Sequence, residues 1–371
     1  MKQHFRDGNL LMKLCSGLFT ERLRNSQAFE ADPAKADVFL IHHGQPFLSF
    51  NAAPAIYDYI QHTWPYINRS IALGRTNHFI FLTCDHGPGD CMYVERPIQL
   101  GQHPFWWDPP NPKRIVGHLL FNGLRDGADA SRTECLVCFQ HGKDVQLITA
   151  QAVCGPLCGY NISTLRNLAA WGTKKHVHLR TTTVFYGGRI DAKRGEGDNT
   201  GRAQMLLHHK GRHGWRIINT AGDEETGEIS VEDKSLFKSY AEEASRSEFC
   251  YSPLGSFAGD TDRYVAAILF GCIPIMLHTV LGNPMSQPLD EVINWSSFAV
   301  LVGTDDIEHL HDILAEYTAE RKHAMRKVMQ SVWHRFLYTS IYGSYLNESG
   351  KDDAFETMLQ VLESRVSQQI A

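Results

Sequence analysis

Short apolar runs rich in β-branched and aromatic residues alternate with amphipathic stretches along most of this chain. The apolar runs have the length and composition of buried strands, and they predict strands at 36–43, 77–85, 133–139, 144–150, 181–188, 215–220, 248–255, 273–278 and 298–303. The stretches between them show helical spacing and predict helices at 53–62, 202–209, 235–247, 262–270 and 305–317. Strands and helices that alternate in this way are typical of a parallel α/β fold.

The alternation is interrupted by a stretch without a strong pattern at 151–178, which we interpret as a linker. Each side of this linker has enough strands for a sheet of its own. The sequence therefore predicts two Rossmann-like domains, at 1–172 and 178–330, with a ligand cleft between them. Residues 331–371 are helical in pattern and are expected to form a C-terminal helical tail.

The composition describes a soluble globular protein and narrows the choice of partners. The chain of 371 residues is 43% apolar and 21% charged, which is ordinary for soluble domains. Its formal net charge of −5, without a run of Lys and Arg, argues against a nucleic-acid partner. No stretch has the length of a transmembrane span. Because Lys13 interrupts the short apolar patches near the N-terminus, no signal peptide or anchor is expected either.

The nine cysteines are too sparse for a disulfide scaffold. The spacing of Cys135 and Cys138, followed by Cys154 and Cys158, could suit zinc, but a strand would direct the first pair to opposite faces. We therefore expect buried or partly disulfide-bonded cysteines. Asn-x-Ser sequons, which would suit a secretory lumen, occur at Asn68, Asn161, Asn294 and Asn347.

Residues 249–302 carry the strongest functional signal of the sequence. They read as a strand that ends in a Gly-rich loop, a lone Arg263, a helix of small residues, and then Gly-Cys-Ile-Pro-Ile at the start of another strand. A diphosphate needs such an arrangement, because backbone N–H groups and the positive end of a helix contact its oxygens while a guanidinium neutralises its charge. The segment therefore predicts a diphosphate-binding site.

This segment resembles the C-terminal half of the exostosin-type glycosyltransferases, in which FCL-P-G is followed by Ser-Arg-Leu-x-Glu-Ala and then GCIPV. Other segments similar to those of the family follow the family's order, at 36–39, 64–69, 74–79, 85–87, 143–145 and 185–189. The likeness covers about residues 28–305. It implies the two-domain GT-B architecture, with a nucleotide-sugar cleft and a helical tail that packs back across both domains. It also implies a Golgi location, although the anchor of the family is not visible in this sequence.

Two positions depart from the pattern of the family. The family usually has an acidic residue three positions after the loop arginine, where this chain has Ala266, and an aspartate where this chain has Asn77. A carboxylate at the first position would hold the nucleotide ribose or tune the site by hydrogen bonds, and alanine can do neither. The loop offers Asp260 and Asp262 as substitutes, so the departure at Ala266 leaves the activity itself in question.

The nucleotide-sugar site is expected at the carboxyl ends of the strands of the second half, where open α/β sheets bind ligands. Arg189 and Arg263 are candidates for the diphosphate, because both follow Gly-containing turns at strand ends. The structural alternative for Arg263 is a surface arginine on an amphipathic helix. Further candidates near the loop, with structural turn roles as their alternative, are Ser252, Gly255, Thr261 and Asp262.

The general base is expected from the first half. His42 and His43 follow its first strand, and Asp85 and His86 follow its second. Asp85 is the first candidate and His42 the second, and for each of them a structural histidine or a turn-capping aspartate is the alternative. Aromatic side chains that could stack on sugar rings, or anchor the core and loops instead, are Trp64, Tyr66, Trp106 and Trp107.

The resemblance implies transfer of a sugar from a UDP-sugar donor to a hydroxyl of a glycan or glycoprotein acceptor. It implies inversion at the anomeric carbon, without a metal or other cofactor. Two other functions stay open. Ala266 favours an inactive UDP-sugar binder or a partner subunit of an active homologue. The resemblance also allows a dimer, formed with a second copy of this chain or with a related transferase. A metal-dependent hydrolase could use His42 and Asp85, because His and Asp at adjacent strand ends can converge on one ion.

Overall fold

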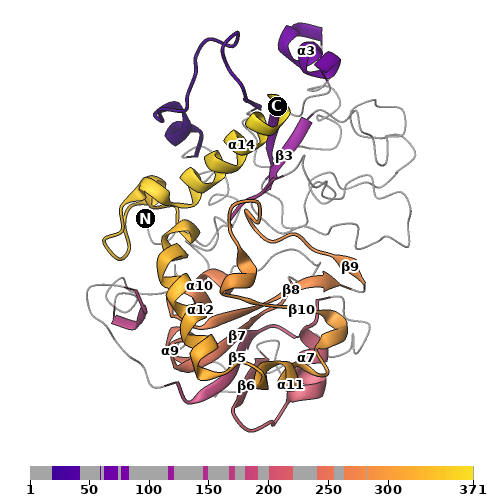
Figure 1. The fold of residues 1–371 in the computed structure, drawn as a ribbon, viewed down its shortest axis with the longest axis vertical. Coiled ribbons are helices and arrows are strands. Elements are labelled where there is room, and N and C mark those ends of the chain that lie inside the picture. The colour runs from indigo at the N-terminus through magenta and orange to yellow at the C-terminus, as the bar shows by residue number, and fades with distance from the viewer. Residues whose placement is uncertain are drawn as a thin grey trace.

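The chain has a mixed α/β fold with two sheets of parallel strands in the computed structural model (Figure 1). The structure describes residues 19–41, 59, 62–73, 77–82, 116–120, 145–148, 167–171, 180–190, 200–219, 240–254, 263–280 and 282–370. The α/β class and the parallel strand pairing predicted from the sequence are confirmed. The predicted strand at 133–139 and most of the predicted helix at 53–62 lie outside the described residues.

The first sheet is built from the first half of the chain. Its strands, in the order β1-β2-β3-β4, are β1 (Phe39–Ile41), β2 (His78–Leu82), β3 (Val116–Leu120) and β4 (Val145–Gln146). Each strand pairs with its neighbours in parallel. The sequence did not predict β3, because Gly117 and His118 interrupt its apolar run. β1 and β2 are parallel neighbours, so their carboxyl ends lie at the same edge of this first sheet.

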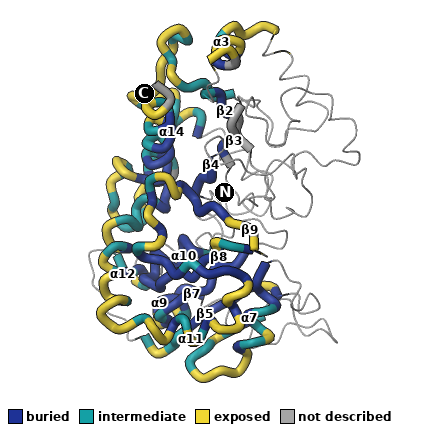
Figure 2. The backbone as a smooth tube through the Cα atoms, turned by 45° about the vertical axis from the view of Figure 1, so that its right-hand side comes forward, coloured by how far each residue is buried: buried dark blue, intermediate teal, exposed yellow. Residues whose placement is uncertain are grey.

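The second sheet contains most of the buried hydrophobic residues that the structure describes. Its strands are β5 (Thr182–Gly188), β6 (Trp215–Asn219), β7 (Ser247–Ser252), β8 (Ile273–Val280), β9 (Asn283–Pro284) and β10 (Val300–Gly303). The order is β10-β8-β7-β5-β6, and only the short β9, beside β8, runs antiparallel. The first five residues of β8 are buried, as expected for a strand covered on both faces. Figure 2 shows that buried residues gather in these strands and in the helix next to them.

Helices cover the second sheet as the strand order requires. The chain passes from β5 to β6 through α7 (Arg202–His209), and then returns past β5 to β7 through α9 (Tyr240–Arg246). The next connection, from β7 to β8, is α10 (Arg263–Leu269), which packs against both of these strands and against α9. Because crossovers between parallel strands are right-handed, α9 and α10 share one face, while α7 covers the other.

A disulfide joins two adjacent strands of this sheet. Cys250 in β7 bonds to Cys272, directly before β8, with their Cα atoms 5.7 Å apart. Both cysteines are buried. The expectation of buried or partly disulfide-bonded cysteines is confirmed for this pair. The four cysteines considered for zinc, Cys135, Cys138, Cys154 and Cys158, lie outside the described residues.

The C-terminal residues are helical, as predicted, but they form several separate elements. These are α12 (Ala319–Val332), a 3-10 turn at Trp333–Phe336, α13 (Thr339–Tyr342), a second 3-10 turn at Gly350–Asp352 and α14 (Ala354–Ile370). The loop before the second turn is fixed by the half-buried carboxylate of Glu348, which accepts hydrogen bonds from two hydroxyls and two backbone amides. The chain can therefore reverse its direction after α13 and return toward the first half.

Several contacts between described residues join the two halves of the molecule. The amide of Leu289 donates to the carbonyl of Gln146 in β4 (2.9 Å), and the hydroxyl of Tyr338 donates to the carbonyl of Ile148 (2.6 Å). α14 then runs along the first half, where Phe355 packs on the ring of Phe19 (centroids 4.9 Å apart). Figure 1 shows α14 extending from the second sheet toward β3. The ion pair Arg22–Glu356 lies beside this contact.

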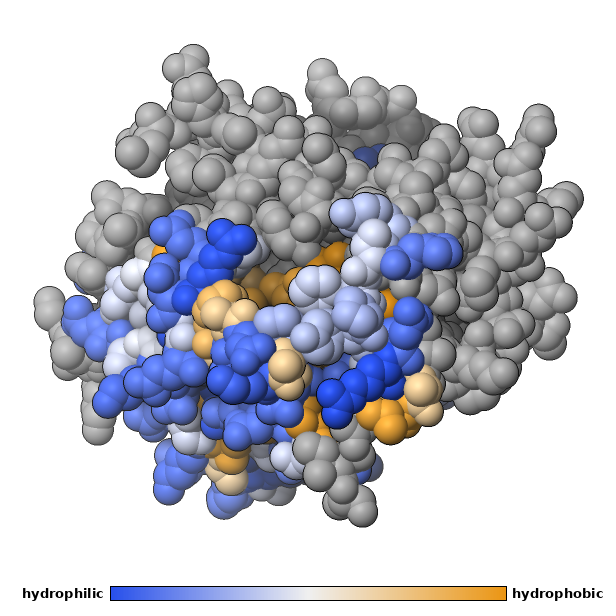
Figure 3. All heavy atoms as spheres, turned by 90° about the horizontal axis from the view of Figure 1, so that it is seen from above, coloured by the Kyte–Doolittle hydropathy of each residue, from blue (hydrophilic) through white to orange (hydrophobic). Residues whose placement is uncertain are grey.

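On the face seen in Figure 3, the described residues are mostly hydrophilic, with small hydrophobic areas between them. The large hydrophobic side chains that are exposed include three at or near α3 (Pro65–Leu73), a helix that the sequence did not predict: Tyr59, Trp64 and Leu73. Among the described helices, none combines the length and the apolar character needed to cross a bilayer.

Candidate functional site

The second sheet has a topological switch point between β5 and β7. The chain leaves β5 toward β6 on one side, and it leaves β7 toward β8 on the other. Connections that diverge in this way open a crevice at the carboxyl ends of the two strands, which is where parallel α/β sheets bind ligands. Gly188 ends β5 and Ser252 ends β7. The predicted diphosphate residues therefore belong to the two segments that border this point.

Arg263 lies against the end of β5. Its Nε donates to the carbonyl of Gly187 (3.2 Å), and its guanidinium carbon is 5.5 Å from the ring centroid of Tyr186. A Cβ atom at Gly188 would be only 2.5 Å from Nη2 of Arg263. In this position the guanidinium of Arg263 occupies the space that a Cβ atom at the last residue of β5 would fill. The first residue of α10 is thereby brought to the strand that precedes Arg189.

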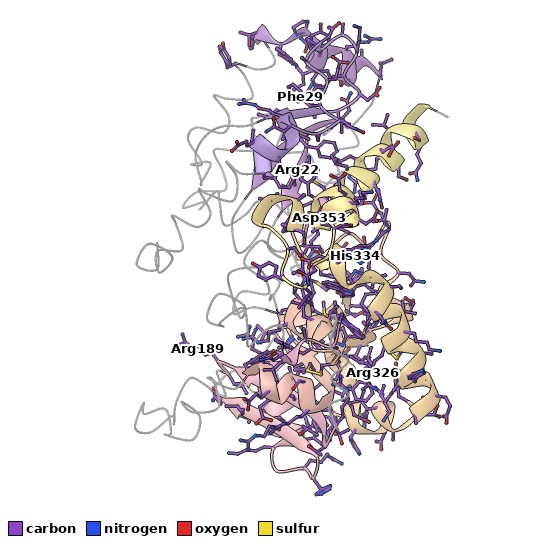
Figure 4. All side chains as sticks on the ribbon, turned by 90° about the vertical axis from the view of Figure 1, so that its left-hand side faces the viewer. Arg22, Phe29, Arg189, Arg326, His334 and Asp353 are labelled. Carbon is purple, nitrogen blue, oxygen red and sulfur yellow. A yellow bond between two sulfur atoms is a disulfide. The ribbon has the colours of Figure 1, made fainter. Side chains whose placement is uncertain are left out.

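Arg189 has a fixed backbone and an exposed side chain. Its carbonyl accepts hydrogen bonds from Nη1 of Arg202 (3.1 Å) and from the hydroxyl of Tyr186 (3.3 Å). The side chain projects outward at the edge of the second half in Figure 4. Because two hydrogen bonds hold the carbonyl of Arg189, the backbone from which its side chain extends is fixed. The structure therefore brings Arg189 and Arg263 to the same strand end.

Arg202, the first residue of α7, is a site residue that the sequence analysis missed. It is 7% exposed, and it bonds to both segments at the switch point. Nε donates to the carbonyl of Leu254 after β7 (2.8 Å), and Nη1 donates to the carbonyl of Arg189 after β5. The sequence did contain a signal for this residue: Gly201 ends a Gly-rich loop, and Arg202 is the first residue of the predicted helix at 202–209. Arg202 thus links the two segments that carry the candidate ligand-binding residues.

Gly201 allows α7 to begin at this place. It has φ of 73°, and a Cβ atom there would be 2.5 Å from the hydroxyl oxygen of Tyr251. That hydroxyl instead donates to the carbonyl of Gly201 (3.0 Å). At the other end of α7, Nε2 of the buried His209 bonds to the carbonyl of Ile307 (2.6 Å). Burial lowers the pKa of His209, so its imidazole is neutral near pH 7.

The opposite end of α10 is capped by two arginines. Nη2 of Arg180 donates to the carbonyl of Phe270 (3.2 Å), and Nε of Arg326 donates to the carbonyl of Gly271 (3.2 Å). Cations at this end complement the helix dipole. Burial lowers the pKa of Arg180 to about 9 and also lowers that of Arg326, the nearby Glu248 acting in the opposite direction. Figure 4 shows Arg326 on the side of the molecule away from Arg189, so this pair supports α10 from behind the site.

The remaining predicted residues fall into two groups. Ser252 is buried, with 4% of its surface exposed at the end of β7. Ala266, one turn after Arg263, is fully buried, so a carboxylate in its place would need a hydrogen-bonding partner inside the core. The candidates that lie outside the described residues are Gly255, Thr261, Asp262, His42 and Asp85.

The arginines at the switch point offer positive charge for a polyanion. The side chain of Arg263 is bonded to the end of β5, Arg189 is the residue that directly follows this strand, and Arg202 bonds to the segments that follow β5 and β7. Guanidinium groups bind phosphate oxygens with two hydrogen bonds at a time. Within the described residues, no group of three or more His, Cys, Asp or Glu side chains is arranged to hold a metal ion. This edge of the sheet can therefore neutralise a diphosphate.

Comparison with known proteins gives a consistent family. The model of the Exostosin GT47 domain matches residues 129–317. Exostosin-1 of Drosophila melanogaster is 26% identical over 263 residues, which cover 65% of this chain and 32% of that protein. A probable glucuronosyltransferase, GUT1, of Oryza sativa subsp. japonica is 36% identical over 91 residues, covering 24% of this chain and 21% of that protein. The chain thus spans between a fifth and a third of the length of these relatives.

Solved structures show only distant likeness. The N-terminal domain of trehalose-6-phosphate phosphatase from Candida albicans aligns with 85% of this chain and 76% of its own at a TM-score of 0.33 and 11% identity. TarM aligns with 81% of this chain and 58% of its own at a TM-score of 0.33 and 8% identity. Likeness of this degree adds nothing to the fold described above.

Proposed function

Because the chain belongs to the exostosin GT47 family, we propose that it is a glycosyltransferase that uses a UDP-sugar. The sugar is transferred to a hydroxyl of a glycan or glycoprotein, with inversion at the anomeric carbon. The family membership supports the glycosyltransferase class. The relatives named above include a probable glucuronosyltransferase, and the chain is also similar to a probable β-1,4-xylosyltransferase of Arabidopsis thaliana. The names of these relatives are consistent with either a hexosyl or a pentosyl donor.

One observation carries the donor assignment: Arg263 bonds to the carboxyl end of β5, which Arg189 directly follows, at the switch point of a parallel sheet. In the proposed reaction the bond between the sugar and the diphosphate breaks as the acceptor oxygen attacks. Negative charge then grows on the departing UDP, and two guanidinium groups stabilise it. This role of the arginines supports a mechanism in which no metal has to bind the diphosphate.

The base is proposed to come from the first half. Asp85 is the first choice and His42 the second. His42 directly follows β1 and Asp85 lies three residues after β2, and these strands are parallel neighbours. The described strands that precede these two positions in the sequence therefore end at one edge of the sheet. A base there would take the proton of the acceptor hydroxyl during a single displacement.

The architecture proposed for this reaction is GT-B, with Rossmann-like domains at 1–172 and 178–330 and a helical tail at 331–371. The two parallel sheets support it, and so does α14, whose residues Phe355 and Arg365 contact Phe19 of the first half and Glu291 of the second. A dimer with itself or with a related transferase, and a Golgi location, are part of the same proposal. The buried disulfide Cys250–Cys272 supports maturation in an oxidising compartment.

A second function is favoured by one feature, the buried Ala266. If the acidic residue of the family is needed for turnover, this chain binds UDP-sugars without transferring them, or it supports an active homologue. UDP release, measured across a panel of UDP-sugars with and without glycan acceptors, separates the two functions. Turnover supports the transferase, whereas UDP binding without turnover of any donor supports the inactive binder. Turnover that EDTA abolishes contradicts the metal-free mechanism.

The donor site is tested directly by Arg263→Ala. The loss of a charged hydrogen-bonding partner should weaken UDP binding by about 1.5–3 kcal/mol, as measured by calorimetry. Arg216→Ala is the matched control, because Arg216 is an exposed arginine on β6 of the same sheet. Unchanged UDP affinity in Arg263→Ala contradicts the assignment of this site.

A further inference from the structure

Two histidines with no part in the donor site meet where the end of α7 lies against α11 (Leu310–Ala315). His209 is the last residue of α7, and His311 is the second residue of α11. Their ring centroids are 5.9 Å apart, and the ring planes cross at 62°. Figure 1 shows the two helices next to each other beside β6. The fold thus brings together two imidazoles that are far apart in the sequence.

The imidazole of His209 is held in one orientation by its neighbours. One face of the ring stacks on Trp215 of β6, with centroids 4.2 Å apart. Its Nε2 bonds to the carbonyl of Ile307, directly before the segment that leads into α11. Because a carbonyl oxygen can only accept, Nε2 carries the hydrogen, and in the neutral ring Nδ1 keeps its lone pair.

His311 is oriented by the same kind of contact. Its Nε2 lies 3.1 Å from a carboxylate oxygen of Asp312, which also accepts and does not donate. Nδ1 of the neutral His311 ring therefore keeps its lone pair as well. The two contacts leave the same nitrogen of each ring for a further ligand.

The Nδ1 atoms of His209 and His311 are both buried, and among the described residues neither has a hydrogen-bonding partner. The whole of His209 is inaccessible to solvent. A buried acceptor without a partner is costly, and here two of them belong to neighbouring rings. An electron-pair acceptor shared by both nitrogens would satisfy the two at once.

The arrangement has the features of a metal-ligand pair. A histidine that binds a metal through one nitrogen usually donates from the other to a carbonyl or a carboxylate, as both rings do here. With zinc–nitrogen bonds of about 2.0–2.1 Å, each ring centre lies about 3.2 Å from the ion, so two ligand rings are at most about 6.4 Å apart. The observed 5.9 Å is within this limit.

The surroundings allow a cation to enter. The side chain of His311 is 32% exposed, which gives a route from solvent and room for water as a further ligand. One like charge is near, because Arg212 adds to the effect of burial in lowering the pKa of His209. The carboxylate of Asp312, on the other ring, offsets it.

We propose that His209 and His311 bind a divalent transition-metal ion through their Nδ1 atoms, with water in the remaining positions. Imidazole nitrogen is an ordinary ligand of zinc, and zinc is the probe for this site. The ion ties the end of α7 to α11. Because α7 begins at Arg202, the ion also steadies the helix that links the two segments of the donor site.

The test uses the full chain, stripped of metal with EDTA and dialysed, and follows Zn²⁺ binding by calorimetry. We expect the parent chain to bind one equivalent of Zn²⁺ more than His311→Gln. Asp312→Asn should weaken the binding of this equivalent about tenfold, because the partner that orients the ring is neutralised. Asp312 is 71% exposed, so this variant keeps the fold. His323→Gln, which replaces an exposed histidine on α12, is the matched control and should bind as the parent does.

Stability gives a second readout. Zn²⁺ should raise the urea midpoint of the parent chain and of His323→Gln, but not that of His311→Gln. Equal Zn²⁺ stoichiometry and affinity in the parent and in His311→Gln overturn the site, and so does a loss of the same size in His323→Gln. The measurement uses no substrate, so its result is independent of the proposed function. His311→Gln also gives the reference for the EDTA experiment above, because EDTA cannot act through this pair in that variant.

Discussion

Replacement of Arg202 by methionine should weaken UDP binding without removing any group proposed to touch UDP. The substitution keeps an unbranched side chain inside the molecule, but it deletes the hydrogen bonds to the carbonyls of Arg189 and Leu254. A hydrogen bond from a charged group contributes about 1.5–3 kcal/mol. With partial rehydration of both carbonyls, we expect the free energy of unfolding to fall by about 3 kcal/mol.

The effect on binding follows from what Arg202 holds. Without Arg202, the carbonyl of Arg189 keeps only its bond from the hydroxyl of Tyr186, and the less ordered Arg189 has to be fixed again when the ligand binds. We expect this to cost about 1–1.5 kcal/mol, or roughly a tenfold rise in the Kd for UDP. Arg202→Lys should be intermediate in stability, because an ammonium keeps the charge but lacks the planar fork that reaches two carbonyls.

The assay pairs UDP calorimetry with urea unfolding, and it is run at a temperature where every variant is fully folded. Arg216→Met serves as the control, because it exchanges an exposed arginine of the same sheet for the same residue. If Arg202→Met loses stability but binds UDP with the affinity of the parent chain, the link between the two segments is structural only, and the reasoning about the switch point is wrong.

Three further outcomes are expected. Gly188→Ala should lower UDP affinity in calorimetry while the far-UV spectrum is retained, because the new methyl group displaces Arg263; unchanged affinity would mean that Arg263 is not needed in this position. Burial alone would raise the pKa of Glu348, but its backbone and hydroxyl hydrogen bonds lower it below 4.5. The stability that they contribute is therefore present above about pH 4.5 and lost as the pH falls through the folded pKa, and urea titrations of Glu348→Gln should lack this acid-dependent loss. Replacing both Cys250 and Cys272 by alanine should lower the free energy of unfolding by about 3 kcal/mol, and a reductant should then have no further effect on the variant.

The second half could be predicted closely because its strands are buried on both faces. Continuous apolar runs identified β5, β7 and β8, and the predicted helix at 202–209 has the same bounds as α7. The first half was harder to predict. β3 contains glycine and histidine, and α3 was interpreted only as a motif, because its proline is tolerated in the first turn of a helix but looks like a break in the sequence.

The candidate site was predicted only in part, for a physical reason. Arg189 and Arg263 follow glycines at strand ends, which is a local signal, and the structure brings them together. Arg202 acts through carbonyls that are 13 and 52 positions away in the chain. Spacing along a sequence contains no information about such contacts, because they depend on how the strands are ordered in the sheet.

The contacts between the halves restrict how the molecule can move. Gln146 and Ile148, at the edge of the first sheet, bond to Leu289 and Tyr338 of the C-terminal residues. Arg365 of α14 bonds in turn to the segment that contains Leu289, through Glu291 (2.9 Å). A wide hinge rotation would have to break all of these bonds together. The relative position of the two sheets is therefore set during folding, and a ligand that needed the halves further apart would first have to break these contacts.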